Sequence, residues 1–303
     1  MKTNKYRTIM ISDIENDMVG KEIIVSGWVQ NIRDHGGVLF LDLRDTSGVL
    51  QTVSNDGSIF KGLAKETVIR LKGILRKRDE DTINKKIKSG EVELLISELD
   101  VLGESLHELP FEIMSSKQVS EDVRLKYRYL DMRNDKVKDN ILLRSEILHF
   151  LRNKMYDLSF TEVQTPILTA SSPEGARDFV VPSRNFKGKF YALPQAPQIY
   201  KELLMVGGID KYFQIAPCFR DEDARSDRTL EFYQLDLEMN FVTEEEVLLL
   251  GEEIFHSVFT KYSDKKVSPK PFRRISYNDS MEMYGTDKPD LRNPLIIKDI
   301  SKI

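Results

Sequence analysis

Residues 219–238 read FRDEDARSDRTLEFYQLDLE, two segments with apolar ends around a loop of alternating acids and arginines. This pattern predicts two strands joined as an antiparallel hairpin. Such a hairpin places Arg220 and Glu222 at the end of the first strand and Phe232 at the start of the second. An arginine fork matches phosphate oxygens two at a time, and an aromatic ring suits a purine face. The segment therefore fits a nucleotide site on a sheet, or else a surface hairpin with many salt bridges.

The composition is that of an ordinary globular protein. The 303 residues suggest about two domains, and 40% of them are hydrophobic and 31% charged. The net charge of −4 argues against a nucleic-acid-binding surface over the whole protein. Residues 70–88, however, hold eight Lys and Arg against three Asp and Glu, which fits either a nucleic-acid contact or a solvated loop.

The cellular setting follows from what the sequence lacks. Cys218 is the only cysteine, so no disulfide can form within the chain. Neither a signal peptide nor an apolar run of membrane-spanning length is evident. We therefore expect a cytoplasmic protein without a membrane partner.

The N-terminal part predicts a small all-β barrel. Short segments with strand-like composition are separated by turns rich in Gly, Asp and Asn. Five strands of this kind form the OB-fold, a common oligonucleotide binder. The expected strands are residues 22–29, 37–44, 48–53, 68–75 and 91–96.

Strand parity singles out one aromatic residue in the second of these strands. Side chains alternate between faces, so the leucines at 39, 41 and 43 share the core face. Phe40 then lies on the other face with Asp42 and Arg44. A phenylalanine on a charged face is placed to stack on an unpaired base, or it is covered by a neighbouring loop.

The remainder predicts an α+β domain on an antiparallel sheet, because strands and helices follow one another in mixed order. We expect a barrel domain over residues 1–108, a linker over 109–133 and the α+β domain over 134–303. Within the last, the expected elements are a helix at 140–158, strands at 160–167 and around 179–193, a helix at 198–205, the 219–238 hairpin and a helix at 243–262.

Several segments together resemble one enzyme family. Residues 219–238 resemble motif 2 of the class II aminoacyl-tRNA synthetases: an aromatic residue, Arg, any residue and Glu, then a variable loop and Phe. The helix and strand ended by Pro166 resemble motif 1, which in that family builds the dimer interface. Four further segments resemble the bacterial type of aspartyl-tRNA synthetase. They are GWV at 27–29, RYLD at 128–131, PEGARD at 173–178 and YALPQ at 191–195.

The resemblance implies that aspartate is activated with ATP and transferred to the 3′ end of aspartate tRNA, with Mg²⁺ as cofactor. Arg220 matches the catalytic arginine that bridges the amino-acid carboxylate and the α-phosphate. Lys201 matches the lysine that takes the aspartate side chain. The implied aspartate contacts are Glu174, Gln198, Lys201, Arg220 and Asp236, and the implied ATP contacts are Arg220, Asp221, Glu222, Thr229 and Phe232.

The same resemblance implies partners. In the barrel, Phe40 matches a position that stacks on the anticodon, Gln51 one that bonds its middle base, and Arg33 lies on the same surface. We expect tRNA as a partner and a homodimer through the motif 1 region. The residues HGG at 35–37 resemble members that also charge asparagine tRNA, although the glycines also fit a simple turn.

One family feature is missing. No glycine-rich strand with an arginine, the third motif, follows Glu238, and KPDLR at 288–292 resembles the start of an inserted domain. We therefore expect the N-terminal portion of a longer enzyme, inactive alone, with no metal site of its own. The alternatives are a non-catalytic tRNA-binding relative of a synthetase, opposed by Arg220 and Lys201, and an asparaginyl- or lysyl-tRNA synthetase.

Overall fold

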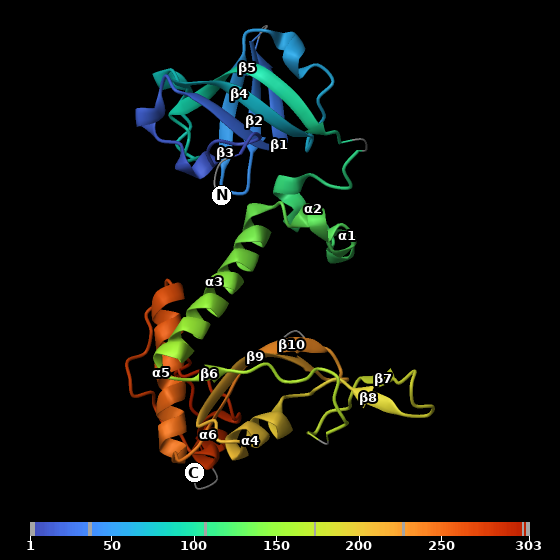
Figure 1. The fold of residues 1–303 in the computed structure, drawn as a ribbon. Helices are drawn as coiled ribbons and strands as arrows, with labels where there is room; N and C mark the ends of the chain where they lie inside the picture. Colours follow the sequence, from blue (N-terminus) through green and yellow to red (C-terminus); the bar gives the residue numbers. More distant parts are fainter. Residues whose placement is uncertain are drawn as a thin grey trace. The chain divides into compact units, whose positions relative to one another are not determined.

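The computed structural model describes residues 4–35, 38–105, 108–172, 174–225, 228–298 and 300. The chain divides into two compact units, Met1–Tyr127 and Arg128–Ile303 (Figure 1). Each unit has its own hydrophobic cluster. The barrel and the α+β sheet are therefore described separately.

Five strands close the barrel of the first unit in the order β1-β2-β3-β5-β4. Their bounds are β1 Glu22–His35, β2 Val38–Arg44, β3 Val49–Ser54, β4 Val68–Lys77 and β5 Val92–Gly103. All neighbours are antiparallel except β3 and β5, which pair in parallel. The predicted OB-fold is confirmed. Short 3₁₀ helices lie at Ile11–Asp13, Asn16–Met18, Gly57–Phe60 and Glu80–Thr82.

Strand β5 is longer than its sequence pattern predicts. Its second half is polar and carries little alternation, but it pairs with β4 through cross-strand charges. Arg70 lies 2.6 Å from Asp100, and Lys72 lies 3.1 Å from Glu98. Such opposite-charge pairs stabilise the part of the strand that lies beyond its buried apolar residues.

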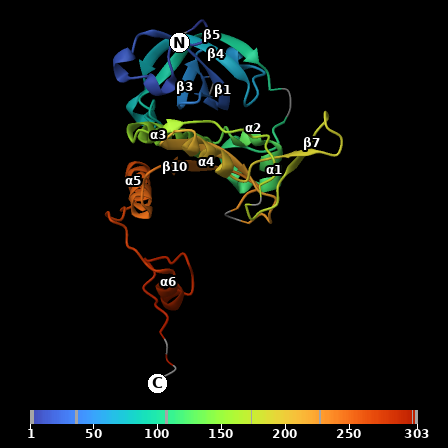
Figure 2. The same ribbon diagram turned by 60° about the horizontal axis from the view of Figure 1, so that its bottom comes forward.

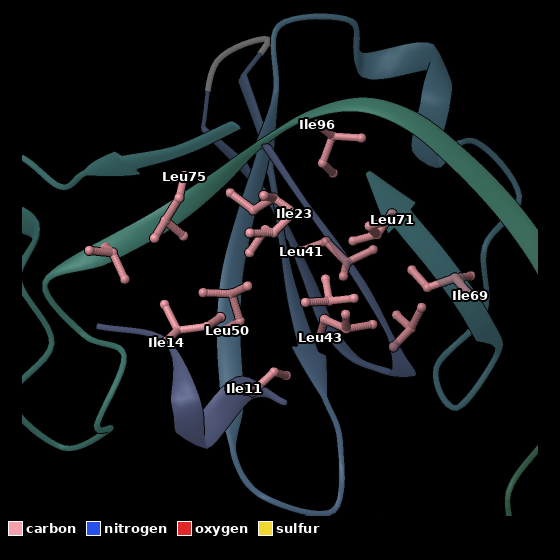
Figure 3. Close-up of a cluster of buried hydrophobic side chains, with 14 of the residues drawn as sticks. Ile11, Ile14, Ile23, Leu41, Leu43, Leu50, Ile69, Leu71, Leu75 and Ile96 are labelled. Atoms are coloured by element: carbon pink, nitrogen blue, oxygen red, sulfur yellow. The ribbon is translucent and has the colours of Figure 1, made fainter. Parts of the chain in front are cut away.

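Of the leucines that parity assigns to the core, two are fully buried, and Leu39 is partly buried and packs against the same cluster. Leu41, Leu43 and Leu50 are fully buried and point toward one another inside the barrel (Figure 3). The expectation for Arg44 is wrong, because this side chain is 3% exposed rather than on a charged outer face. Its Nη2 donates to both carboxylate oxygens of Glu66, at 2.9 and 2.7 Å, which compensates the burial of its charge.

Short helices follow the barrel, at η5 Ile113–Gln118, α1 Glu121–Lys126 and α2 Arg128–Asp131. Each has fewer than two turns, too few for a helical period to show in the sequence.

The second unit contains one mixed sheet and one small hairpin. Its helices and strands are α3 Asp135–Asp157, β6 Thr161–Glu162, β7 Val180–Pro182, β8 Phe190–Ala192, α4 Gln198–Val206, β9 Lys211–Phe219, β10 Glu231–Met239, α5 Glu244–Tyr262 and α6 Tyr277–Tyr284. The main sheet has the order β10-β9-β6, and β7 pairs with β8 alone. An extended segment leads from α5 to α6 (Figure 2).

The sheet differs from the predicted antiparallel one. Strands β9 and β10 are antiparallel as expected, but β6 joins β9 in parallel. The strand expected at 160–167 also shrinks to Thr161–Glu162. The chain leaves the ladder because Thr165 N donates to the side chain of Gln214 at 3.2 Å, and Pro166 has no N–H to donate.

The two faces of the β9–β10 pair have opposite character. One face carries Phe213, which packs in a cluster with Met155 of α3 and Ile254 of α5. Helix α4 packs against β9 and β10, and its Lys201 contacts Asp236 on the other, polar face. The helices of the described chain include none with the length and apolar character needed to cross a membrane.

Candidate active site

The polar face of the β9–β10 pair forms the floor of the candidate site. Side chains alternate along each strand, and the register places Phe232 opposite Cys218 and Asp236 opposite Gln214. Arg220 follows β9 directly and continues the same parity. The floor residues are Tyr212, Gln214, Cys218, Arg220, Phe232, Gln234, Asp236 and Glu238.

One end of the floor pairs a cation with an aromatic ring. The guanidinium carbon of Arg220 lies 5.0 Å from the centroid of Phe232. The Arg220 backbone N donates to Leu230 O at 2.9 Å, which fixes the start of the loop. Its Nε is buried without a hydrogen-bond partner among the described residues. Buried donors are normally satisfied, so an anionic ligand fits this position.

The other end of the floor is a compact charge cluster. Lys201 Nζ lies 3.0 Å from Asp236 Oδ1 and 3.2 Å from Glu238 Oε2. Burial alone lowers the pKa of Lys201, but its hydrogen bond with Asp236 and the charges of both carboxylates raise it above its ordinary value. Burial raises the pKa of Asp236 despite Lys201. Both directions agree with one lysine facing two carboxylates.

The two ends of the floor are well separated along β10. Phe232 and Asp236 are four residue steps apart, about 13 Å at ~3.3 Å per residue. Cys218 lies opposite Phe232, its thiol donates to Gln234 Oε1 at 3.1 Å, and burial raises its pKa to about 11. The charges of Arg220, Asp236 and Glu174 all act on this thiol. Arg220 and Asp236 lie on this floor, and the loop that carries Glu174 is bonded to the residue after Arg220, since Asp221 N donates to Arg177 O at 3.0 Å.

The loop that carries Glu174 lies beside a cavity of about 140 Å³. Ser172 Oγ donates to Glu174 Oε1 at 3.2 Å. The cavity lining includes Ser172, Glu174, Asp178 and Gln195. Pro173, quoted in the family motif, lies outside the described residues.

The remaining predicted residues are less closely placed. Gln198 begins α4, and its Nε2 donates to Glu202 at 2.7 Å, along the helix. Asp221, Glu222 and Thr229 are exposed in the loop after β9. Part of that loop, residues 226–227, lies outside the described chain.

Two site residues escaped the sequence analysis. Glu238 is the second carboxylate on Lys201, and period-2 alternation from Phe232 onward points to it. Gln195 is 2% exposed and bonds the Glu174 loop, but nothing in the sequence except the motif around it marks it.

The barrel surface brings the three predicted anticodon residues together. Arg33 pairs with Phe40 across β1 and β2. Arg33 Nη2 donates to Asp42 Oδ1 at 2.7 Å and to Gln51 Oε1 at 3.1 Å. Gln51 Nε2 in turn donates to Glu93 at 2.7 Å. Of the HGG segment, residues 36–37 lie outside the described chain.

A magnesium site is not evident in this part of the chain. Among the described residues, no three or more His, Cys, Asp or Glu are grouped so that they could hold a metal ion.

Comparison with known proteins agrees with this geometry. The family of class II tRNA synthetases (D, K and N) matches residues 120–301, and the OB-fold nucleic acid binding domain matches residues 23–102. The chain belongs to the class II tRNA synthetases of this D, K and N group. The similarity includes the barrel, since a relative from Pelagibacter ubique is 53% identical over 99% of this chain.

That relative is named "Aspartate--tRNA(Asp/Asn) ligase", as is one from Rickettsia akari, also 53% identical over 99% of this chain. The chain spans about half the length of these curated relatives, 51% of each. Among solved structures, a putative aspartyl-tRNA synthetase from Leishmania major matches with a TM-score of 0.76 and 25% identity, covering 86% of this chain and 53% of that one. An asparaginyl-tRNA synthetase from Pyrococcus horikoshii matches with a TM-score of 0.76 and 23% identity. The match covers 90% of this chain and 65% of that one, and it shows a shared fold.

Proposed function

We propose that the chain carries the barrel and the amino-acid-activating floor of an aspartate–tRNA ligase. The observation that carries this proposal is the cluster of Lys201 with Asp236 and Glu238, on the same strand face as the Arg220–Phe232 pair. An amino acid with a carboxylate side chain needs a cation for that carboxylate and an anion for its ammonium group. A nucleotide needs an arginine for its phosphates and an aromatic ring for its base. The names of the 53% identical relatives support the same substrate.

Each charged residue then has a role in binding aspartate. Lys201 binds the side-chain carboxylate, because it is the cation of the cluster. Asp236 binds the ammonium group through Oδ2, which is buried without a hydrogen-bond partner among the described residues. Glu174, from its loop, contributes a second negative charge, and Gln198 a polar contact at the start of α4.

The other end of the floor positions ATP. Phe232 stacks on adenine, and Arg220 Nε donates to the α-phosphate that the aspartate carboxylate attacks. Donors fixed where charge develops stabilise the transition state without reorganisation. Asp221, Glu222 and Thr229 line the loop nearby.

The barrel binds the anticodon loop of the tRNA, with Phe40 stacking on a base while Arg33 and Gln51 contact base edges. The relatives named for both tRNAs favour aspartate tRNA and asparagine tRNA as substrates. Charging purified transcripts of each tRNA tests this. If only aspartate tRNA were charged, asparagine tRNA would be excluded as a substrate.

We further propose a cytoplasmic homodimer. Helix α3 exposes Ile141, Leu142 and Leu143 by 45, 48 and 41%, and Ile167 and Leu168 are similarly exposed. Exposed apolar side chains in this number are often covered by a partner, and a two-fold dimer is the commonest arrangement.

Aspartate-dependent exchange of pyrophosphate into ATP tests the proposed reaction on the full-length gene product. Exchange that depends on aspartate supports the ligase. RNA binding without exchange would instead favour the non-catalytic relative, and exchange with asparagine or lysine would favour a different ligase of the group.

A further inference from the structure

Gln195 binds a loop of the candidate site on several sides. Its Oε1 accepts from Ala176 N at 3.0 Å. Its Nε2 donates to Ala176 O at 2.9 Å and to Ser172 O at 3.3 Å, and also contacts the carboxylate of Asp178. The side chain is 2% exposed. These bonds span the segment that carries Glu174.

The segment around Gln195 also contacts the hairpin that carries Arg220. Phe219 N, at the end of β9, donates to Pro194 O at 2.9 Å. The loop and the hairpin meet directly as well: Asp221 N donates to Arg177 O at 3.0 Å. The backbone on either side of Arg220 is therefore bonded to the same assembly as Glu174.

Only an amide of this length fits the position. The Ala176 N–H needs an acceptor, while Ser172 O and Ala176 O need donors, and the amide of Asn or Gln offers an acceptor oxygen together with two N–H donors. Asn is one methylene shorter. A glutamate would lose the donors and place its carboxylate against Asp178. The loop has no regular structure to replace these bonds, since residues 174–176 form neither helix nor strand.

We infer that Gln195 is a positioning residue for amino-acid activation. It holds the loop so that Glu174 lines the cavity before substrate arrives, and it couples the order of this loop to that of the Arg220 hairpin. The inference rests on the proposed function, because the loop then closes over aspartate and the hairpin over ATP. Loss of Gln195 therefore weakens the binding of both substrates together.

Hydrogen–deuterium exchange on the 303-residue chain tests the structural half. The variants are Gln195→Glu, which keeps the acceptor, and Gln195→Met, which keeps the volume without buried charge. Gln118→Glu is the control, because Gln118 is exposed. We expect the Ala176 amide to exchange about tenfold faster in Gln195→Met, which removes its acceptor, as losing a bond of ordinary strength predicts. The Asp221 amide, which donates to Arg177 O, should exchange faster in both variants because the loop that carries Arg177 loses the donors of Gln195. Unchanged exchange in both would overturn the inference.

Pyrophosphate exchange on the full-length gene product tests the functional half. We expect the KM for aspartate and the KM for ATP each to rise about 10- to 100-fold in the Gln195 variants, with a smaller change in kcat. A fall in kcat alone, or unchanged KM values, would overturn the positioning role. If the wild-type protein shows no aspartate-dependent exchange, the proposed function fails, whereas amide exchange still decides whether Gln195 holds the loop.

Discussion

Removing the charge of Lys201 separates its structural role from its role in catalysis. The side chain is 12% exposed and lies within 3.2 Å of two carboxylates, so Lys201→Met leaves both of them without a cation. Breaking a buried ion pair costs about 3–5 kcal/mol. Glu238 is 34% exposed, however, and water relieves part of that cost. We expect a loss of ~2 kcal/mol, which corresponds to about 4–8 °C in Tm at ~2–4 °C per kcal/mol.

The loss of stability in Lys201→Met depends on pH with a definite sign. Burial already raises the pKa of Asp236 above its ordinary 3.8, and removal of Lys201 raises it further. A carboxyl group with a raised folded-state pKa lowers stability where it is ionised, above that pKa. The destabilisation is therefore complete at neutral pH and diminishes as the pH falls through the raised pKa.

A second substitution distinguishes stability from binding. Lys201→Met combined with Asp236→Asn removes one unpaired carboxylate, so part of the Tm returns. Aspartate activation does not return, because the cation for the substrate side chain is still missing. A charged hydrogen bond contributes about 1.5–3 kcal/mol, so we expect kcat/KM for aspartate to fall about 10- to 150-fold in Lys201→Met. It should fall further in the double variant, which also removes the carboxylate proposed to bind the substrate ammonium group.

Thermal unfolding and pyrophosphate exchange measure the two effects. Lys187→Met is the matched control, since Lys187 is exposed in the turn of the β7–β8 hairpin. Normal aspartate kinetics in Lys201→Met, together with the expected loss of Tm, would show that the cluster is only structural. That result would refute the proposed substrate contact.

Three further changes test the remaining sites. Phe40→Ala should weaken the affinity of the chain for aspartate tRNA at fixed salt by about 1–3 kcal/mol per unstacked base, and equal affinity would refute stacking. Arg220→Ala should slow pyrophosphate exchange ~10²–10³-fold without changing tRNA affinity, and near-normal exchange would refute its role. Leu142→Glu on the exposed side of α3 should shift sedimentation at micromolar protein from dimer to monomer, whereas a wild-type monomer at every concentration would contradict the proposed interface.

Local patterns in the sequence predict the strands and the hairpin well. Alternation alone identifies Leu41 and Leu43 as core residues, and both are fully buried. The same parity misplaces Arg44, because its partner Glu66 comes from outside the strand and no local pattern shows that contact. The parallel pairing of β6 with β9 is missed for the same reason, since the two strands are almost fifty residues apart in sequence.

The residues of the candidate site likewise fall into those that local spacing predicts and those that it does not. Arg220 and Phe232 lie in one hairpin, so their proximity follows from local spacing. Lys201 and Asp236 come from different elements, so local spacing cannot predict their contact. Before the structure, only the family resemblance assigned both residues to one site. Gln195 acts through loop backbone groups, which leave no residue pattern to detect.

The central claim is that this floor activates aspartate, and the choice of amino acid tests it most directly. Pyrophosphate exchange on the full-length gene product is measured with aspartate, asparagine and lysine, each supplied alone at equal concentration. The cation of Lys201 selects a carboxylate side chain, so we predict exchange with aspartate and at least ~10-fold less with asparagine, which lacks the charge. Equal or faster exchange with asparagine or lysine, or none with aspartate, would contradict the account.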